Sequence, residues 1–250
     1  MAGARVVYGV HPVREALRSG RVQALFVAEG ESGPAIKEIL DAARGANVQP
    51  VYHGRAQLDE LAERGVHQGL VAVVGEYNFA QLDELQHVAR KAGQPPLIVV
   101  LDSVQDPQNL GALVRTAHVA GAHGIVIPKD RAVGITPTVV KASAGATEHV
   151  KIVTVVNISR ALEELKEQGV WIAGAVAAGG SKSPWDIDFT VPIALVLGAE
   201  GKGIRPLVLR NCDLQVKIPM SGKVASLNVG AAGAMLLYEI VRQRSTAPAA

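Results

Sequence analysis

From residue 97 onward the chain carries short runs of apolar residues that do not alternate with polar ones. Such runs are typical of strands that are buried on both faces of a parallel sheet. None approaches the roughly 20 apolar residues that a membrane-spanning helix needs. The runs are Leu97–Leu101, Gly124–Ile127, Ile152–Val156, Val170–Val176, Ile193–Leu197 and Leu214–Ile218, with helical segments between them at Leu110–Val119, Ser159–Gln168 and Val229–Arg242. This order predicts a doubly wound α/β domain with a parallel sheet.

The first 74 residues predict a smaller α/β/α domain of short alternating elements. Its strands are expected at Arg5–Tyr8, Ala24–Val27, Val48–Tyr52 and Leu70–Val74, and its helices at Pro12–Arg18, Ala35–Ala43 and Leu58–Ala62. Residues 75–96 form a polar amphipathic helix that closes in Gly93-Gln94-Pro95-Pro96, which favours a linker. We therefore expect domains at 1–74 and 97–244, the linker 75–96 between them, and a disordered tail at 245–250.

Composition narrows the functional classes. The single cysteine, Cys212, cannot form an intramolecular disulfide, and no Cys and His residues occur at zinc spacing, so we expect no metal. The net charge is +2 and its excess lies in the larger domain: residues 1–95 carry 10 Lys and Arg against 11 Asp and Glu, whereas residues 96–250 carry 15 against 12. No signal segment opens the chain, so we expect a cytoplasmic protein that does not enter the membrane.

Three strand exits are unusual, and ligands of parallel α/β sheets bind beyond the carboxyl ends of the strands. The exit 102–111 is a polar loop that opens a helix, with Asn109 as a candidate N-cap and Arg115 further along. The exit 198–204 contains three glycines, which let a ligand approach the backbone. The exit 219–230 places Ser226 and Asn228 before a helix that starts with small residues.

Each exit alone also has an ordinary structural interpretation: a capped surface helix, a tight turn, or close helix packing. The glycine segment is not a dinucleotide fingerprint, because Pro206 stands where the third glycine would be. It is not a phosphate-binding Walker loop either, because no Ser or Thr follows Lys202. A nicotinamide-dependent reductase and a kinase are therefore disfavoured.

Taken together and in this order, the segments NLGALVRTA, VLGAEGKGI and IPMSGKVASLNVGAAGAMLLYE resemble the three motifs of the SpoU RNA 2′-O-methyltransferases. The resemblance covers residues 97–244, and Tyr8–Leu17 with His67–Gly69 resemble the family's small RNA-binding domain. It is strongest to the bacterial members that methylate a guanosine of 23S rRNA. It implies S-adenosylmethionine as methyl donor, a homodimer with its sites at the subunit interface, and a deep C-terminal trefoil knot. In that knot about Ser226–Arg242 would thread the loop around Gly198–Gly203.

The resemblance also implies roles for single residues. Arg115 would stabilise the developing alkoxide of the ribose, because a guanidinium stays protonated and is a poor general base. Asn109 would hold its loop and Arg115, and Glu200, Ser226 and Asn228 would organise the site. The cofactor would contact Leu197, Gly198, Gly203, Ile218, Met220 and Leu227. RNA would contact His11, Arg14, Lys129, Arg131, Lys202 and Lys223, with Lys141 and Arg205 as further phosphate contacts; the alternative is that these charges only solvate the surface.

Two other functions fit the same features. A tRNA ribose methyltransferase of the family would share every catalytic motif, and the N-terminal domain favours 23S rRNA or a large-subunit precursor over tRNA. A non-catalytic RNA-binding protein is an alternative of a different class. The intact set of Asn109, Arg115, Glu200, Ser226 and Asn228 argues against it.

Overall fold

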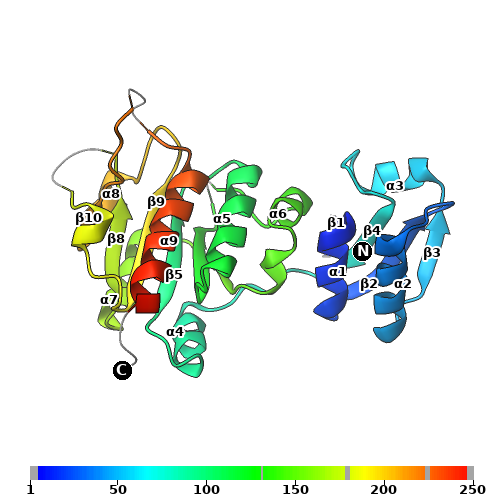
Figure 1. The fold of residues 1–250 in the computed structure, drawn as a ribbon, viewed down its shortest axis with the longest axis horizontal. Coiled ribbons are helices and arrows are strands. Elements are labelled where there is room, and N and C mark those ends of the chain that lie inside the picture. Colours follow the sequence, from blue (N-terminus) through cyan, green and yellow to red (C-terminus); the bar gives the residue numbers. More distant parts are fainter. Residues whose placement is uncertain (1–4, 131, 178–180, 223–225, 247–250) are drawn as a thin grey trace. The chain divides into compact units, whose positions relative to one another are not determined.

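The computed structural model of the chain describes residues 5–130, 132–177, 181–222 and 226–246 (Figure 1). Its residues form two compact units. The first comprises the residues up to Asn78 together with Ile135–His149, and the second comprises Phe79–Gly134 and the residues from Val150 onward. The first unit is therefore built from two separate stretches of the chain.

The first unit contains a four-stranded sheet in the order β1-β4-β2-β3. Strand β4 pairs antiparallel with both β1 and β2, and β3 pairs parallel with β2. The strands are β1 (Arg5–Tyr8), β2 (Val22–Ala28), β3 (Pro50–His53) and β4 (Leu70–Val74), and the helices are α1 (Val10–Arg18), α2 (Pro34–Gly45) and α3 (Arg55–Leu61). Helix α1 contacts α2, β1 and β4, while α3 contacts β2 and β4. The predicted small α/β domain is present.

Charged side chains attach the stretch Ile135–His149 to the first unit. Helix α6 (Pro137–Ala142) packs against β1, and the 3-10 turn Ala146–Glu148 follows it. The Glu148 carboxylate, 1% exposed, lies 2.7 Å from Nη1 of Arg21 and 4.0 Å from Nη2 of Arg5. Both guanidinium groups also lie over the Tyr77 ring, and burial followed by the charge of Glu148 raises the pKa of Tyr77. These long-range contacts correct the predicted domain 97–244, which included this stretch.

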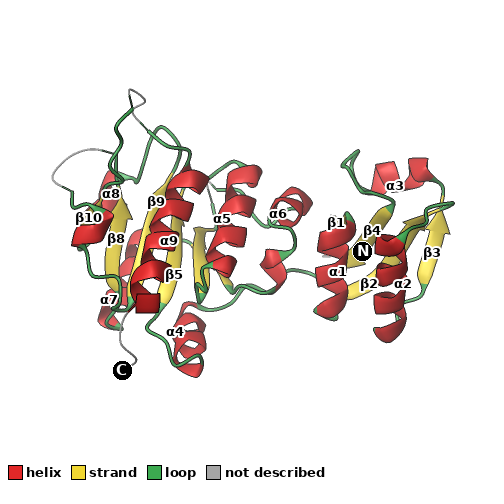
Figure 2. Cartoon of the chain, in the orientation of Figure 1, coloured by secondary structure: helices red, strands yellow, loops and turns green. Residues whose placement is uncertain are grey.

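The second unit contains a six-stranded sheet in the order β10-β8-β9-β5-β6-β7. Figure 2 labels β10, β8, β9 and β5 of this sheet. Every neighbouring pair of its strands is parallel. The central strands, β5 (Leu97–Asp102) and β9 (Ile193–Gly198), are buried along their length apart from Gly198. The others are β6 (Gly124–Pro128), β7 (Ile152–Val155), β8 (Trp171–Ala175) and β10 (Leu214–Val216). The apolar runs are thus confirmed as strands of a parallel sheet.

Helices cover both faces of this sheet. On one face, α4 (Leu82–Lys91), α7 (Ile158–Glu167) and α8 (Pro206–Arg210) share a core cluster with alternate strand residues such as Val196. Leu197 points to the opposite face, where α5 (Pro107–Val119) and α9 (Val229–Thr246) pack together. A Cβ at Gly233 of α9 would collide with the side chains of Leu113 and Leu197, so glycine permits this close packing. The doubly wound architecture is confirmed, and the trefoil knot stays a prediction.

Two predicted boundaries need correction. Residues 75–96 are more than a linker, because α4 buries Leu85 and Ala89 in the second unit. The last helix extends to Thr246, beyond the predicted start of the tail, because Arg244 donates hydrogen bonds to the carbonyls of Pro95, Pro96, Phe189 and Val191. Burial lowers the pKa of Arg244 to about 10, so this anchor stays charged at neutral pH. The rest of the predicted tail, 247–250, lies outside the described residues.

No helix within the described ranges is long and apolar enough to cross a membrane.

Candidate functional site

A pocket opens at the carboxyl ends of β8, β9 and β10, and encloses about 730 Å³ including its mouth. All six residues predicted to bind the cofactor line it: Leu197, Gly198, Gly203, Ile218, Met220 and Leu227. Glu200 and Ser226 line it too, as do Val229, Ala232 and Leu236 of α9. The walls are apolar, with polar groups at the glycine loop and before α9.

The glycine loop is closed on itself. Ala199 and Gly203 exchange two backbone hydrogen bonds, of 3.1 and 2.8 Å, so residues 199–203 form a tight turn at the end of β9. A Cβ at Gly198 would collide with the backbone of Gly203 and Ile204. Only glycine allows the two ends of this loop to approach so closely. The two ends of the loop are therefore held in direct backbone contact at the edge of the pocket.

Three polar side chains from three motif segments form one hydrogen-bonded chain. The Nδ2 group of Asn109 donates to Oε2 of Glu200 at 3.3 Å, and its Oδ1 accepts from Nδ2 of Asn228 at 2.9 Å. Oδ1 of Asn228 in turn accepts from the backbone N–H groups of Gly230 and Ala231 at the start of α9. The structure thus brings together segments that are 91 and 119 residues apart in sequence.

One expectation for the first motif differs from the structure. Asp106 rather than Asn109 is the N-cap of α5, because its carboxylate accepts from the backbone N–H of Gln108 and Pro107 occupies the first turn. The side chain of Asn109 is hydrogen-bonded to Glu200 and Asn228, and its predicted role of holding Arg115 stays a prediction. Arg115 is exposed and does not line the pocket, and it makes no hydrogen bond or ion pair with the residues that the structure describes. With Ala112 and Val119 it forms an exposed stripe along α5.

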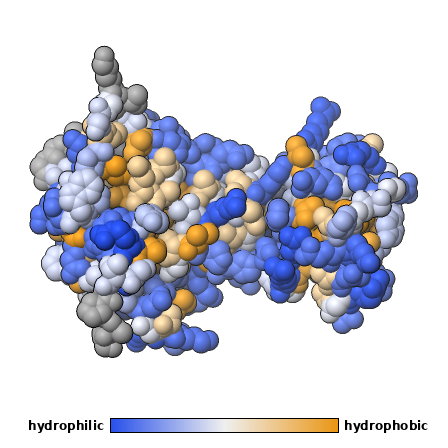
Figure 3. Space-filling model, in the orientation of Figure 1, coloured by the Kyte–Doolittle hydropathy of each residue, from blue (hydrophilic) through white to orange (hydrophobic). Residues whose placement is uncertain are grey.

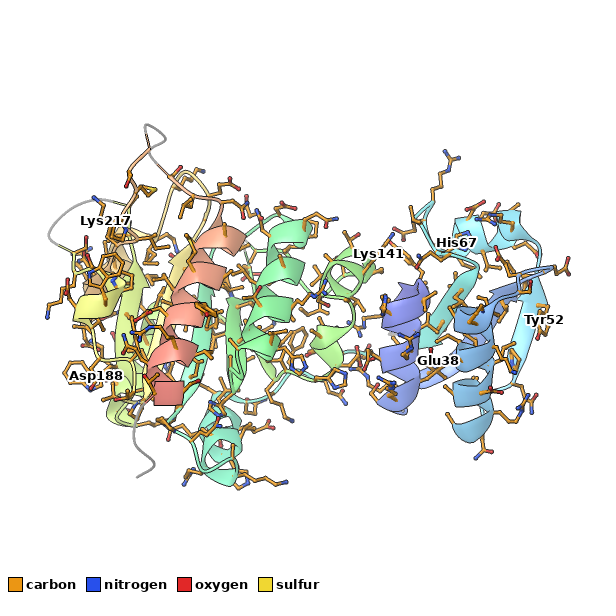
Figure 4. The ribbon with its side chains drawn as sticks, viewed as in Figure 1. Glu38, Tyr52, His67, Lys141, Asp188 and Lys217 are labelled. Atoms are coloured by element: carbon orange, nitrogen blue, oxygen red, sulfur yellow. The ribbon has the colours of Figure 1, made fainter. Side chains whose placement is uncertain are left out.

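The RNA-binding candidates are scattered. In the first unit, His11 is exposed, while Nη2 of Arg14 lies 2.7 Å from Glu38 and its Nη1 lies 3.2 Å from the ring of His11. Glu38 is labelled in Figure 4. In the second unit, Lys129 after β6 and Lys202 in the glycine loop are exposed. Arg131 and Lys223 lie outside the described residues. The structure therefore leaves His11, Lys129 and Lys202 accessible, and ties Arg14 into a pair.

The two further phosphate candidates are engaged in the protein's own structure. Nζ of Lys141 donates to the carbonyl of Val66 at 3.0 Å and lies over the ring of Tyr8. Arg205 pairs with the buried Asp102 at 2.7 Å. The pair was not predicted from the sequence, although an aspartate at the end of a fully apolar strand is a visible signal.

Thiol and metal chemistry find little support in the described part of the chain. Burial, followed by the neighbouring charge of Asp213, raises the pKa of Cys212 to about 12, so this thiol stays protonated at neutral pH. No group of three or more His, Cys, Asp or Glu side chains there is arranged to hold a metal ion. The polar groups at the pocket are amides, a carboxylate and a hydroxyl.

Comparison with known proteins matches both units to one kind of enzyme. The profile described as "SpoU rRNA Methylase family" matches residues 96–238, and the profile "RNA 2'-O ribose methyltransferase substrate binding" matches residues 6–80. The chain is 43% identical over 240 residues to YacO of Bacillus subtilis, assigned to the TrmH family of tRNA/rRNA methyltransferases. It is 41% identical over 241 residues to the 23S rRNA (guanosine-2'-O-)-methyltransferase RlmB of Pseudomonas aeruginosa. Each alignment covers 96% of both chains.

A solved structure extends this likeness to three dimensions. The SpoU methyltransferase AviRb from Streptomyces viridochromogenes superposes with a TM-score of 0.83 and 27% identity, covering 98% of this chain and 91% of its own. A second structure of AviRb contains its cofactor AdoMet, and superposes with a TM-score of 0.81. Profile, sequence and structure thus agree, and the chain belongs to the SpoU rRNA methylase family.

Proposed function

We propose that this protein transfers a methyl group from S-adenosylmethionine to the ribose 2′-OH of a guanosine in 23S rRNA. The observation that carries the proposal is the pocket beyond β9, where the second and third motif segments meet and the first is hydrogen-bonded to both. RlmB, which has this activity in its name, aligns along nearly the whole chain, including the N-terminal unit. Such an enzyme acts on 23S rRNA or a large-subunit precursor in the cytoplasm.

The lining of the pocket suits the donor molecule. Ile218, Leu227 and Leu197 offer apolar surfaces for the two faces of an adenine ring. The glycine loop offers backbone N–H and C=O groups for the polar edges of the base and ribose, and the close contact of Gly198 with the backbone of Gly203 and Ile204 holds the loop in its tight turn. When bound, the cofactor would supply a methyl group on a positively charged sulfur. The protein's own residues must then orient the ribose and stabilise its oxygen.

Arg115 is the residue that we propose for that stabilisation. A ribose 2′-OH is a weak acid, so transfer requires an environment that favours the developing alkoxide. Arg115 offers a guanidinium that is exposed, charged and uncommitted to the described residues. Asn109, Glu200 and Asn228 hold one another at the pocket mouth, and Ser226 lies in its lining, so these four would position the RNA ribose and the loops. Positioning of this kind is a large part of catalysis for a displacement reaction.

We further propose that the enzyme works as a homodimer through the exposed face of α5 and α9. Ala112, Arg115 and Val119 on α5 run beside Ala231, Met235 and Tyr238 on α9, and Met235 and Tyr238 are 55% and 73% exposed. Figure 3 shows apolar surface over these two helices. A second copy seated there would bring Arg115 to the subunit boundary. Met235→Asp should convert the dimer to a monomer in sedimentation, and a wild-type monomer would contradict the proposal.

The test of the activity is methylation with radiolabelled S-adenosylmethionine and separate pools of unmodified rRNA and tRNA. We expect label in 23S rRNA, recovered as 2′-O-methylguanosine after nuclease digestion. Label in tRNA alone would favour the tRNA methyltransferase, and label in neither pool would favour the non-catalytic RNA-binding protein.

A further inference from the structure

Asp102, the last residue of β5, has a completely buried and fully engaged carboxylate. Its side chain is 0% exposed. Oδ2 accepts the backbone N–H of Arg205 at 2.8 Å, and Oδ1 accepts Nε of Arg205 at 2.7 Å and lies 2.7 Å from Nη2. Ser103 Oγ donates to the same Oδ1 at 3.3 Å. Charge-assisted hydrogen bonds to a guanidinium in such a fork are among the strong polar contacts of proteins.

The partner of this carboxylate stands at the exit of the glycine loop. Arg205 follows Gly203 and Ile204 and is the N-cap residue of α8. The entrance of the loop, Gly198, pairs with Asp102 itself in the β5–β9 register. Asp102 therefore holds both ends of the loop, the entrance through strand pairing and the exit through its side chain. The loop residues between them form one wall of the pocket.

The backbone next to Asp102 is unusual as well. Ser103 has φ 66, in the left-handed region that a residue with a side chain rarely adopts. Such a conformation is disfavoured for a residue with a side chain and persists only where the surroundings impose it. Here it redirects the chain from β5 into the first motif loop, while the Ser103 hydroxyl adds a contact to the carboxylate.

We propose that Asp102 and Arg205 are positioning residues for cofactor binding. Their pair fixes the exit of the glycine loop, so that Gly198 and Gly203 stay against the pocket and Glu200 stays within reach of Asn109. Neither residue lines the pocket, so neither is a catalytic residue. The role replaces the RNA phosphate contact that the sequence suggested for Arg205. The inference rests on the proposed function, since it assumes that the pocket takes S-adenosylmethionine.

A matched control exists in the same unit. Nζ of Lys166 lies 2.7 Å from Asp213, whose Oδ2 accepts the backbone N–H of Ile172 at 2.9 Å. This second pair also joins a carboxylate to a strand, but near the start of β8 and away from the pocket. The two cations are comparably exposed, with side chains 43% and 34% accessible for Arg205 and Lys166. Because Arg205→Ala leaves the buried Asp102 carboxylate without its counterion, Arg205→Lys, which keeps a positive charge beside it, serves as the second variant if Arg205→Ala does not fold.

The experiment measures binding of S-adenosylhomocysteine to the full chain by titration calorimetry, with thermal unfolding and RNA binding followed in parallel. We expect Arg205→Ala to weaken S-adenosylhomocysteine binding about tenfold, and Arg205→Lys to restore part of it, because a lysine keeps the charge but not the fork. Lys166→Ala should leave this affinity within twofold of the wild type. RNA affinity should stay within twofold in every variant. Asp102→Asn should weaken binding by a factor similar to Arg205→Ala, and the double variant should be no weaker than the worse single one.

Three results would overturn the inference: unchanged S-adenosylhomocysteine affinity in Arg205→Ala, an equal loss in Lys166→Ala, or a loss confined to RNA. If the wild-type protein itself fails to bind S-adenosylhomocysteine, the proposed function fails and takes this inference with it. A wild type that binds while the Arg205→Ala variant binds equally well defeats the positioning role alone.

Discussion

In the first unit, polar side chains are used to hold the backbone together. Arg14 pairs with Glu38, and His67, only 3% exposed, is bonded to Asp59 and to the backbone of Gly69 (Figure 4). Both units have an apolar core, and in the second unit Asn109, Asn228 and Glu200 also gather at one end of the sheet beside a pocket. The pocket and the polar side chains proposed for catalysis therefore lie in the second unit. Changes there should alter catalysis, whereas changes in the first should alter its stability and RNA binding.

Arg115→Ala should give the largest effect. We expect single-turnover methylation to fall about a thousandfold, because a group that stabilises developing charge contributes mainly in the transition state. S-Adenosylhomocysteine binding should stay within twofold. Arg160→Ala is the control, since Arg160 is an exposed arginine of the same unit that pairs with Glu164. Methylation within tenfold of the wild type would remove Arg115 from the mechanism.

Glu148→Gln tests the role of the first unit. Removing one partner from a buried charged cluster costs about 3 kcal/mol, because the remaining charges of Arg5 and Arg21 lose their counterion. Urea unfolding should show this loss in the first unit, with weaker RNA binding and unchanged S-adenosylhomocysteine affinity. Glu164→Gln, at an exposed pair, should cost at most about 0.5 kcal/mol. If Glu148→Gln weakened S-adenosylhomocysteine binding, cofactor binding could not be assigned to the second unit alone.

Asn109→Ala should have an intermediate effect on catalysis. This variant leaves Glu200 and Asn228 without their shared partner. We expect a loss of about 2 kcal/mol of transition-state stabilisation, which corresponds to roughly a 30-fold drop in kcat/KM. Asn211→Ala removes an asparagine of the same unit that contacts Ser159 and Glu163 away from the pocket, and should change kcat/KM less than twofold. Equal losses of kcat/KM in Asn109→Ala and Asn211→Ala would mean that the hydrogen bonds of Asn109 have no special role in catalysis.

The smallest effect concerns pH. Burial, followed by the charge of Arg244, lowers the pKa of His123, whose Nδ1 accepts the backbone N–H of Leu97. The unfolded chain binds a proton at this histidine near pH 6.5 while the folded chain resists it, so stability is complete above that pH and declines below it. Between pH 7.5 and 5.5 the unfolding free energy of the second unit should therefore fall less in His123→Gln than in the wild type. If the unfolding free energies of His123→Gln and the wild type changed in parallel with pH, His123 would not be a source of the pH dependence.

Local patterns accounted for most elements but not for long-range contacts. Strands β1 and β4 have the bounds that apolar residues between breakers predict, and the pocket gathers the six residues predicted to bind the cofactor. The attachment of Ile135–His149 to the first unit was not predictable, because it depends on ion pairs that join residues more than 120 positions apart. The Asp102–Arg205 pair spans 103 positions. The N-cap at Asp106 had a local signal, the following proline, which the more conspicuous Asn109 obscured.

The position of helix α9 after every strand affects how the protein folds during synthesis. The helix follows every strand in the chain, yet it covers one face of the sheet and supplies Val229, Ala232 and Leu236 to the pocket. Synthesis proceeds from the N-terminus at about 5–20 residues per second, so the six strands emerge before the helix that covers them. Until α9 has been synthesised, the sheet face around Leu197 lacks this helix and the cofactor pocket is not formed. A nascent chain therefore cannot use its cofactor to stabilise early folding, and a stalled chain that lacks α9 should aggregate.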